Sequence, residues 1–204
     1  MILARAFADS FQHPTPLIMD YPKPDFRPVS YSRVTLTELM IPTYANFGGK
    51  IHGGILLSLM DKVAYAAASK HAGSYCVTVS VDGVNFLQPV EVGELVSLLA
   101  SVNYVGRTSL LVGIKVIAED VRSGLVKHTN TSYFTMVAKD DSGSPTPVPG
   151  LSLESPEDTR RFVEAIKRRE FKERYRLEFD SAVSTLAVPL ELHLLAQERC
   201  QIAY

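Results

Sequence analysis

The chain has 204 residues, of which 46% are hydrophobic and 21% charged, and its formal net charge at pH 7 is −1. This length and apolar fraction are ample for one folded domain with additional segments, and they exclude a chain that is disordered throughout. A net charge near zero argues against a chain-wide attraction to nucleic acid or to an anionic membrane. We therefore expect no nucleic-acid partner.

The cysteines and the hydropathy pattern indicate the compartment. Cys76 and Cys200 lie far apart and form no CxxC pair, so neither a disulfide framework nor a cysteine-based metal site is indicated. We expect a reducing compartment, the cytoplasm, and no metal. The most apolar stretch, residues 51–68, is interrupted by Asp61 and Lys62. It is too short and too polar for a membrane span, so none is expected.

Glycine and proline divide the chain into three parts. All twelve glycines lie between Gly48 and Gly150, whereas five prolines lie in residues 14–28 and four in residues 145–156. This distribution predicts an N-terminal arm (residues 1–29), a central domain (residues 30–150) and a C-terminal tail (residues 151–204).

The central domain begins with one strand and one long helix. Residues 34–41 alternate apolar and polar side chains at first, which predicts a half-buried strand. A glycine-rich loop follows, and then a run rich in alanine, leucine and methionine that predicts a helix ending at Gly73. Because this helix is apolar almost all round, we expect a sheet on one side of it and a second protein surface on the other.

Four β-rich runs follow, and turn signals separate them: residues 75–86, 94–105, 109–118 and 125–137. Short connections favour antiparallel pairing of successive runs. The order of elements predicts an α+β fold in which a meandering antiparallel sheet curls around one long buried helix. This is the outline of a hot-dog fold.

The tail is predicted to be helical. Ser155, Pro156 and Glu157 form a typical helix start, and the helix is expected to continue to about Phe179. Residues 160–176 carry eight basic and three acidic side chains, a net charge of +5. We favour a solvated helix whose basic residues lie toward the negative end of its dipole, and a surface that faces a nucleotide or phosphate is the alternative.

Asp61 is the first candidate catalytic residue, because a carboxylate inside an apolar helix must be paired, be neutral or face a polar cleft. It follows Gly54 by seven residues, or two helical turns, and so lies on the same side of the helix. Gly54 belongs to a glycine-rich helix start whose backbone amides could form an oxyanion hole, or could serve only close packing. His52 and Asn46 are further candidates, each with a structural role as the alternative.

Other chemistries are excluded by their motifs. Gly49 and Lys50 resemble the end of a P-loop, but Ile51 stands where Ser or Thr is required. The chain contains no GxSxG, HExxH or GxGxxG sequence. Serine-hydrolase, zinc-protease and dinucleotide-binding functions are therefore not expected.

Taken together, the central domain resembles the hot-dog acyl-CoA thioesterases, the group that includes YciA-like enzymes and the cytosolic acyl-CoA hydrolases. The motifs that carry the resemblance are Pro42, Asn46, Gly49, His52-Gly53-Gly54, Leu59-Met60-Asp61, Val81-Asp82-Gly83-Val84-Asn85-Phe86, Pro89-Val90, Val92-Gly93-Glu94-Leu95-Val96, Val105-Gly106-Arg107-Thr108-Ser109, Phe134 to Lys139 and Pro145 to Pro149. In order, they span roughly residues 34–149.

The resemblance implies hydrolysis of an acyl-CoA thioester to a free acid and CoA, with no cofactor beyond the CoA of the substrate. It implies that Asp61 acts as general base or nucleophile, that the amide of Gly54 polarises the carbonyl, and that Asn46 and His52 line the site. The CoA contacts that it implies come from Gly106, Arg107, Thr108 and Ser109, with Asn85 and Phe86 nearby. It also implies a homodimer with sites between subunits, assembled further into a trimer of dimers.

The glycine-rich loop departs from the family pattern, since Tyr44 replaces an aspartate found in many relatives, and Gly48 and Lys50 replace polar or acidic residues. Two alternatives to hydrolysis stay open. One is a non-catalytic acyl-CoA-binding regulator. The other is a 2-enoyl-thioester hydratase, although His52 and Asp61 do not have the spacing of the Asp and His pair of hydratases.

Overall fold

The computed structural model describes residues 26–203, so the predicted N-terminal arm lies almost wholly outside the described residues. The central element is a five-stranded sheet in which every neighbouring pair is antiparallel. In spatial order its strands are β2 (Val34–Leu39), β4 (Leu95–Val105), β5 (Ser109–Asp120), β6 (Leu125–Lys139) and β3 (Tyr75–Val81).

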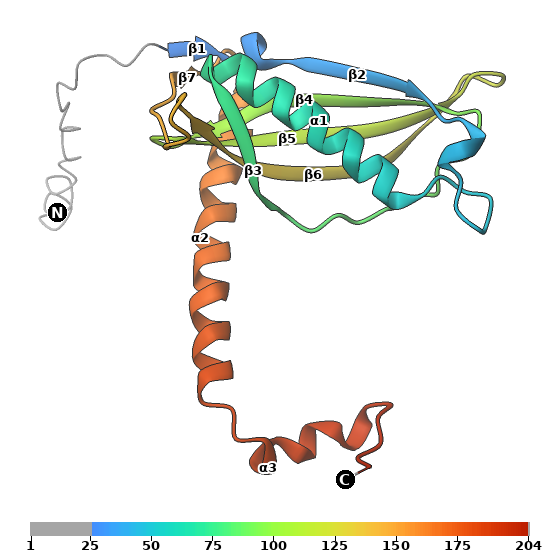
Figure 1. The fold of residues 1–204 in the computed structure, drawn as a ribbon, viewed down its shortest axis with the longest axis vertical. Helices are drawn as coiled ribbons and strands as arrows, with labels where there is room; N and C mark the ends of the chain where they lie inside the picture. Colours follow the sequence, from blue (N-terminus) through green and yellow to red (C-terminus); the bar gives the residue numbers. More distant parts are fainter. Residues whose placement is uncertain (1–25, 204) are drawn as a thin grey trace, which may run out of the picture.

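Helix α1 (Gly53–Ala72) crosses one face of this sheet and contacts all five strands (Figure 1). Its buried side chains include Leu56, Met60, Val63 and Ala67, which follow one another at helical spacing. They pack on the alternate strand residues that point to the same face, such as Val112. The opposite side of α1 is exposed, as expected for a helix that requires a second surface. The α+β hot-dog fold is confirmed.

The position of β3 corrects the predicted four-strand meander. Successive pairing holds for β4, β5 and β6, but β3 pairs with β6 at the far edge and not with β4. The predicted strand 75–86 ends at Val81, and residues 82–94 carry the chain across to the other side of the sheet. This connection is long enough for the crossing, so the argument from short connections does not apply to it.

A small second sheet closes the C-terminal end of α1. Strand β1 (Phe26–Pro28) pairs in parallel with β7 (Gly150–Ser152). Nη1 of Arg27 donates to the carbonyls of Lys70 and His71, at 3.2 and 2.7 Å, and so caps the last turn of the helix. The predicted helix end is confirmed, because Gly73 adopts a left-handed φ of 71°.

His71 makes the stability of this end depend on pH. Its side chain is fully buried; Nε2 lies 3.1 Å from the carbonyl oxygen of Pro149, and Nδ1 has no hydrogen-bond partner among the described residues. Burial lowers the pKa of His71 from its usual 6.5, and the nearby charge of Arg27 also lowers it. The hydrogen bond to Pro149 raises the pKa but does not outweigh burial. The folded state therefore holds this imidazole neutral.

We expect the protein to lose stability at acid pH, and we expect the His71→Gln variant to lose less. Above pH 6.5 the imidazole of His71 is neutral in both the folded and the unfolded state, so it does not change the free energy of unfolding. Below pH 6.5 the unfolded state binds a proton at this imidazole, whereas the folded state keeps it neutral. Each pH unit below that value costs up to about 1.4 kcal/mol until the folded group also titrates. Thermal unfolding at pH 7.5 and 5.5 should show a smaller decrease in Tm for His71→Gln than for wild type. His128→Gln, at an exposed site, should behave like wild type.

The tail is helical, as predicted, but longer. Helix α2 spans Pro156–Ser184, and Ser155 Oγ accepts from the amide of Asp158 at 3.1 Å, which confirms the predicted N-cap. The short helix α3 (Val188–Glu191) follows. Three 3-10 helices complete the described elements: η1 (Val29–Ser32), η2 (Pro42–Tyr44) and η3 (Leu192–Gln197). Among residues 26–203, no helix has the length and apolar character needed to cross a membrane.

Most basic side chains of α2 are paired with acids. Arg160, Arg161, Lys167, Arg174 and Arg176 form ion pairs with acidic residues three or four positions away on the same helix. Each exposed pair contributes little to the stability of the fold. Together the pairs neutralise much of the positive charge of α2, so this charge does not require a bound ligand. The ion pairs agree with the favoured solvated helix, but the last turn of α2 carries no basic side chain, so the basic residues do not lie at the negative end of its dipole.

Candidate active site

The loop before α1 is held by Asn46. Its side-chain Oδ1 accepts from the backbone amides of Gly48 at 2.8 Å and Lys50 at 3.2 Å. The backbone amide of Asn46 donates to the carbonyl of Lys50 at 2.7 Å. The Nδ2 group donates no hydrogen bond to residues 26–203. Asn46 therefore shapes the loop with one end of its amide and presents a free donor with the other.

The residues that depart from the family pattern also hold this loop. Tyr44 donates its hydroxyl to Glu38 Oε1 at 3.1 Å, and this carboxylate raises the pKa of the phenol. Lys50 Nζ lies 2.6 Å from Glu91 Oε1. Both side chains thus tie the loop to the body of the domain.

His52 and Gly54 are engaged with each other at the start of α1. His52 is the N-cap residue, and its Nδ1 accepts from the amide of Gly54 at 2.9 Å. The amide predicted to polarise a carbonyl is thus satisfied by His52 in this structure. Gly53 has a different requirement, because an added Cβ there would lie 3.1 Å from the ring of Phe86. Close packing of Phe86 on the helix start explains this glycine.

Asp61 lies halfway along α1 with its carboxylate exposed. Its Oδ1 accepts from the hydroxyl of Thr78 on β3 at 2.6 Å, and that hydroxyl also lies 3.2 Å from Met136 Sδ. These side chains line a shallow cavity of about 320 Å³, together with Tyr65, Tyr75 and their neighbours. The carboxylate thus meets a polar partner and open space, which a general base needs.

Thr78 was missed by sequence reasoning. It pairs in regular register with Met136, directly before the pairing of β3 with β6 shifts between Thr78 and Ser80. By ordinary alternation it shares one side of β3 with the buried Cys76, two residues earlier. Only the packing of β3 beside α1 brings its hydroxyl to Asp61.

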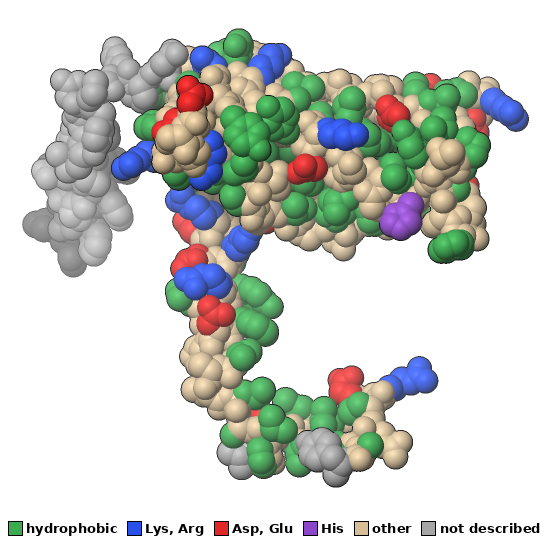
Figure 2. Space-filling model, viewed as in Figure 1, with side chains coloured by type: hydrophobic (Ala, Val, Ile, Leu, Met, Phe, Trp, Pro, Cys, Tyr) green, Lys and Arg blue, Asp and Glu red, His purple; other side chains and the backbone are tan. Residues whose placement is uncertain are grey.

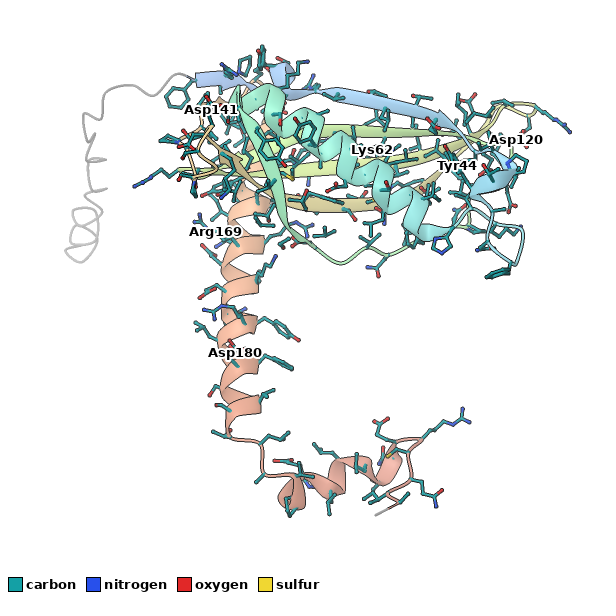
Figure 3. All side chains as sticks on the ribbon, in the orientation of Figure 1. Tyr44, Lys62, Asp120, Asp141, Arg169 and Asp180 are labelled. Atoms are coloured by element: carbon teal, nitrogen blue, oxygen red, sulfur yellow. The ribbon has the colours of Figure 1, made fainter. Side chains whose placement is uncertain are left out.

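The structure does not bring the two halves of the predicted site together within one chain. Gly54 and Asp61 share a side of α1 but are separated by two helical turns, an axial distance of about 10 Å. In Figure 3, Lys62, the neighbour of Asp61 in the chain, lies midway along α1. A single carbonyl cannot lie about 3 Å from both groups, as a shared reaction centre requires.

The predicted CoA-binding turn is a tight connection between β4 and β5. Gly106 donates its amide to the carbonyl of Ser109 at 2.8 Å, and a Cβ at Gly106 would lie 2.7 Å from Ser109 Oγ. The carbonyls of Arg107 and Thr108 accept from the amides of Val148 and Ala138. Backbone hydrogen bonds therefore hold the turn in place. The side chain of Arg107 is exposed.

Asn85 and Phe86 do not lie near this turn, which corrects that expectation for a single chain. The carbonyl of Asn85 accepts from Asn130 Nδ2 at 2.8 Å, in the first half of β6, whereas the turn contacts Ala138 near the end of that strand. Eight residues of strand separate these points, about 26 Å. Phe86 instead packs on Gly53.

Sequence comparison identifies relatives over the same region. The family model described as the Thioesterase superfamily matches residues 48–125. Protein VdlD of Helicobacter pylori is 46% identical over 143 residues, which are 70% of this chain and 82% of that protein. The acyl-CoA thioester hydrolase YkhA of Bacillus subtilis, itself described as uncharacterized, is 34% identical over 145 residues, 71% of this chain and 84% of that protein.

Solved structures agree with this result. A hexameric acyl-CoA thioesterase without ligand is similar with a TM-score of 0.72 and 36% identity, over 74% of this chain and 97% of that one. A variant of the acyl-CoA hydrolase of Staphylococcus aureus in complex with coenzyme A has a TM-score of 0.73 and 30% identity, over 81% and 99% of the two chains. By sequence and by fold, this chain belongs to the thioesterase superfamily.

Proposed function

We propose that this protein hydrolyses acyl-CoA thioesters to a carboxylic acid and CoA, with Asp61 as the catalytic carboxylate. The observation that carries the proposal is the exposed Asp61 carboxylate, which accepts from Thr78 at 2.6 Å in an open cavity. Relatives described as acyl-CoA thioester hydrolases, from Bacillus subtilis and from mammals, support the substrate class.

The spacing of three polar residues adds support. In solved variants of the Staphylococcus aureus hydrolase, an asparagine, an aspartate or a threonine has been replaced by alanine. These positions are fifteen and then seventeen residues apart, which is also the spacing of Asn46, Asp61 and Thr78 in this chain. The same three residue types at the same intervals support a common site.

The chemistry follows from the groups present. The Asp61 carboxylate, as general base, takes a proton from water while the water oxygen bonds to the thioester carbonyl carbon. The carbonyl oxygen gains negative charge, for which the free Nδ2 of Asn46 and the amides at the start of α1 are candidate donors. The C–S bond then breaks, and the proton goes to the leaving CoA sulfur. For Gly54 to donate, its hydrogen bond to His52 must open.

A site between two copies resolves the separation of its halves. Asp61 and Thr78 of one copy would meet Asn46 and the start of α1 of another, so that the 10 Å axial separation within one chain no longer matters. Among residues 26–203, strand β3 is the last strand of the sheet and offers one unpaired edge for such a contact. The exposed side of α1 includes Leu57 and Tyr65, which a partner would cover. Hexameric neighbours support a homodimer assembled into a trimer of dimers.

The proposed CoA contacts are carried from the resemblance. Arg107 is an exposed guanidinium on a turn fixed by its backbone, a suitable group for a phosphate. The turn of residues 106–109 and the pair Asn85 and Phe86 contact β6 at points eight residues apart, about 26 Å, so they would serve one CoA only from different copies. Two free thiols, Cys76 and Cys200, fit the cytoplasm as the proposed location.

The test is release of free thiol from a panel of acyl-CoAs, from acetyl to palmitoyl. We expect turnover of at least one of them without added metal or cofactor. Binding of acyl-CoA with no thiol release would favour the non-catalytic regulator. Loss of the enoyl absorbance of a 2-enoyl-CoA without thiol release would favour the hydratase. Either outcome would overturn the proposal.

A further inference from the structure

Helix α2 crosses the outer face of the sheet, the face opposite α1, and runs past its last strand (Figure 1). Near its start, Phe162 packs on Tyr104 of β4, with ring centroids 5.0 Å apart. Further along, the Arg168 guanidinium lies 3.8 Å from the ring centroid of Tyr133 on β6. Lys172 Nζ then lies 3.0 Å from Asp82 Oδ1, just after β3. Since β3 is the edge strand, the sheet formed by residues 26–203 ends there.

The side of α2 that faces the sheet continues beyond this edge and becomes apolar. Ala165, which is buried, Lys172 and Phe179 are spaced by seven residues, so they lie on one side of the helix. Tyr175, Phe179 and Val183 form a continuous stripe on this side, and they are 66%, 53% and 52% exposed. The rings of Tyr175 and Phe179 stack with centroids 5.7 Å apart. We call these three residues the arm stripe.

The position of the arm stripe points to its occupant. Apolar side chains on the docking side of a helix require a surface to cover them. In Figure 2 the hydrophobic side chains of this part of α2 face the open space between the sheet and the C-terminal segment. A sheet that continued through the free edge of β3 would pass through this space. Residues 173–184 extend about 18 Å, the width of roughly four strands.

We infer that the arm stripe packs on the outer face of a second copy of this chain, joined through the β3 edge. The inference rests on the proposed dimer and adds a second contact to it. By two-fold symmetry each copy would extend its arm over the other, so the contact would be made twice. Helix α2 would then clamp the dimer that the proposed active sites require.

The experiment compares two variants of the full chain. Phe179→Ser with Val183→Ser removes most of the arm stripe. Leu177→Ser is the matched control, because Leu177 is 54% exposed and lies about 200° around the helix from Phe179. All three side chains are exposed within one chain, so neither variant should impair folding, which circular dichroism checks. The readout is the rate of subunit exchange between two fluorescently labelled populations.

We expect the double variant to exchange subunits at least about tenfold faster than wild type, because two apolar side chains per copy lose their cover. The control should stay within about twofold of wild type. A photoreactive residue at position 179, in a mixture of isotopically heavy and light chains, should cross-link heavy to light chains. Unchanged exchange, or cross-links only within one chain, would overturn the clamp while leaving the dimer and its thiol release intact. A monomeric wild-type protein would overturn both the dimer and the clamp.

Discussion

Asp61→Asn is expected to lower kcat/KM for acyl-CoA hydrolysis by about 10²–10⁴-fold, the usual contribution of a general base. Asparagine keeps the size of the side chain and can still accept from Thr78, but it cannot take a proton from water. Since Asp61 is exposed and forms no ion pair within residues 26–203, the fold should be retained. Thiol release under single-turnover conditions and thermal unfolding together measure the two effects.

Two further variants make this result specific. Asp141→Asn makes the same chemical change at an exposed loop position and should leave the rate unchanged. Thr78→Val removes the hydroxyl that donates to Asp61 and should lower the rate by less, about tenfold, because the carboxylate remains but is less well held. If Asp61→Asn hydrolysed acyl-CoA at the wild-type rate, the assignment of the catalytic carboxylate would be wrong.

Mixing two inactive variants should restore activity if each site draws on two copies. We expect Asp61→Asn and Asn46→Ala homodimers each to retain below about 1% of wild-type activity. After subunit exchange in an equimolar mixture, about a quarter of all sites would combine Asp61 from one copy with Asn46 from the other. Activity should therefore rise to about a quarter of the wild-type value, which thiol release measures.

The mixture also distinguishes the two arrangements. If one chain held a complete site, every site in the mixture would still carry one defect, and no activity would return. Asp61→Asn mixed with Thr78→Val is the matched control, because both changes fall in the same half of the site. In that mixture every site would carry either Asp61→Asn or Thr78→Val, so exchange would restore no complete site. Its activity should be the average of the two variants.

The fold class was accessible from sequence because it depends on local patterns. The apolar run before Gly73 predicted α1, and Gly73 ends it with a left-handed φ of 71°. Ser155 predicted the start of α2, and its hydroxyl accepts from the amide of Asp158. Both signals involve backbone groups within a few residues of each other, so they do not depend on the rest of the chain.

The partner of β3 could not be read in the same way. The connection of residues 82–94 reaches either edge of the sheet, and the alternation of β3 is compatible with both. Packing against α1 and β6 decides between them. The same holds for Thr78, which reaches Asp61 from seventeen residues away because β3 packs beside α1.

The sequence by itself determined the elements, the hot-dog class and Asp61 and Asn46 as candidate residues, because residue type and short-range spacing carry that information. Only the tertiary structure decided that Thr78 of β3 meets Asp61, that β3 pairs with β6, and that α2 runs past the edge of the sheet. These contacts join groups far apart in the chain, and they are set by how the helices and strands pack together. That packing, together with the family resemblance, supports the proposal of a site shared between two copies.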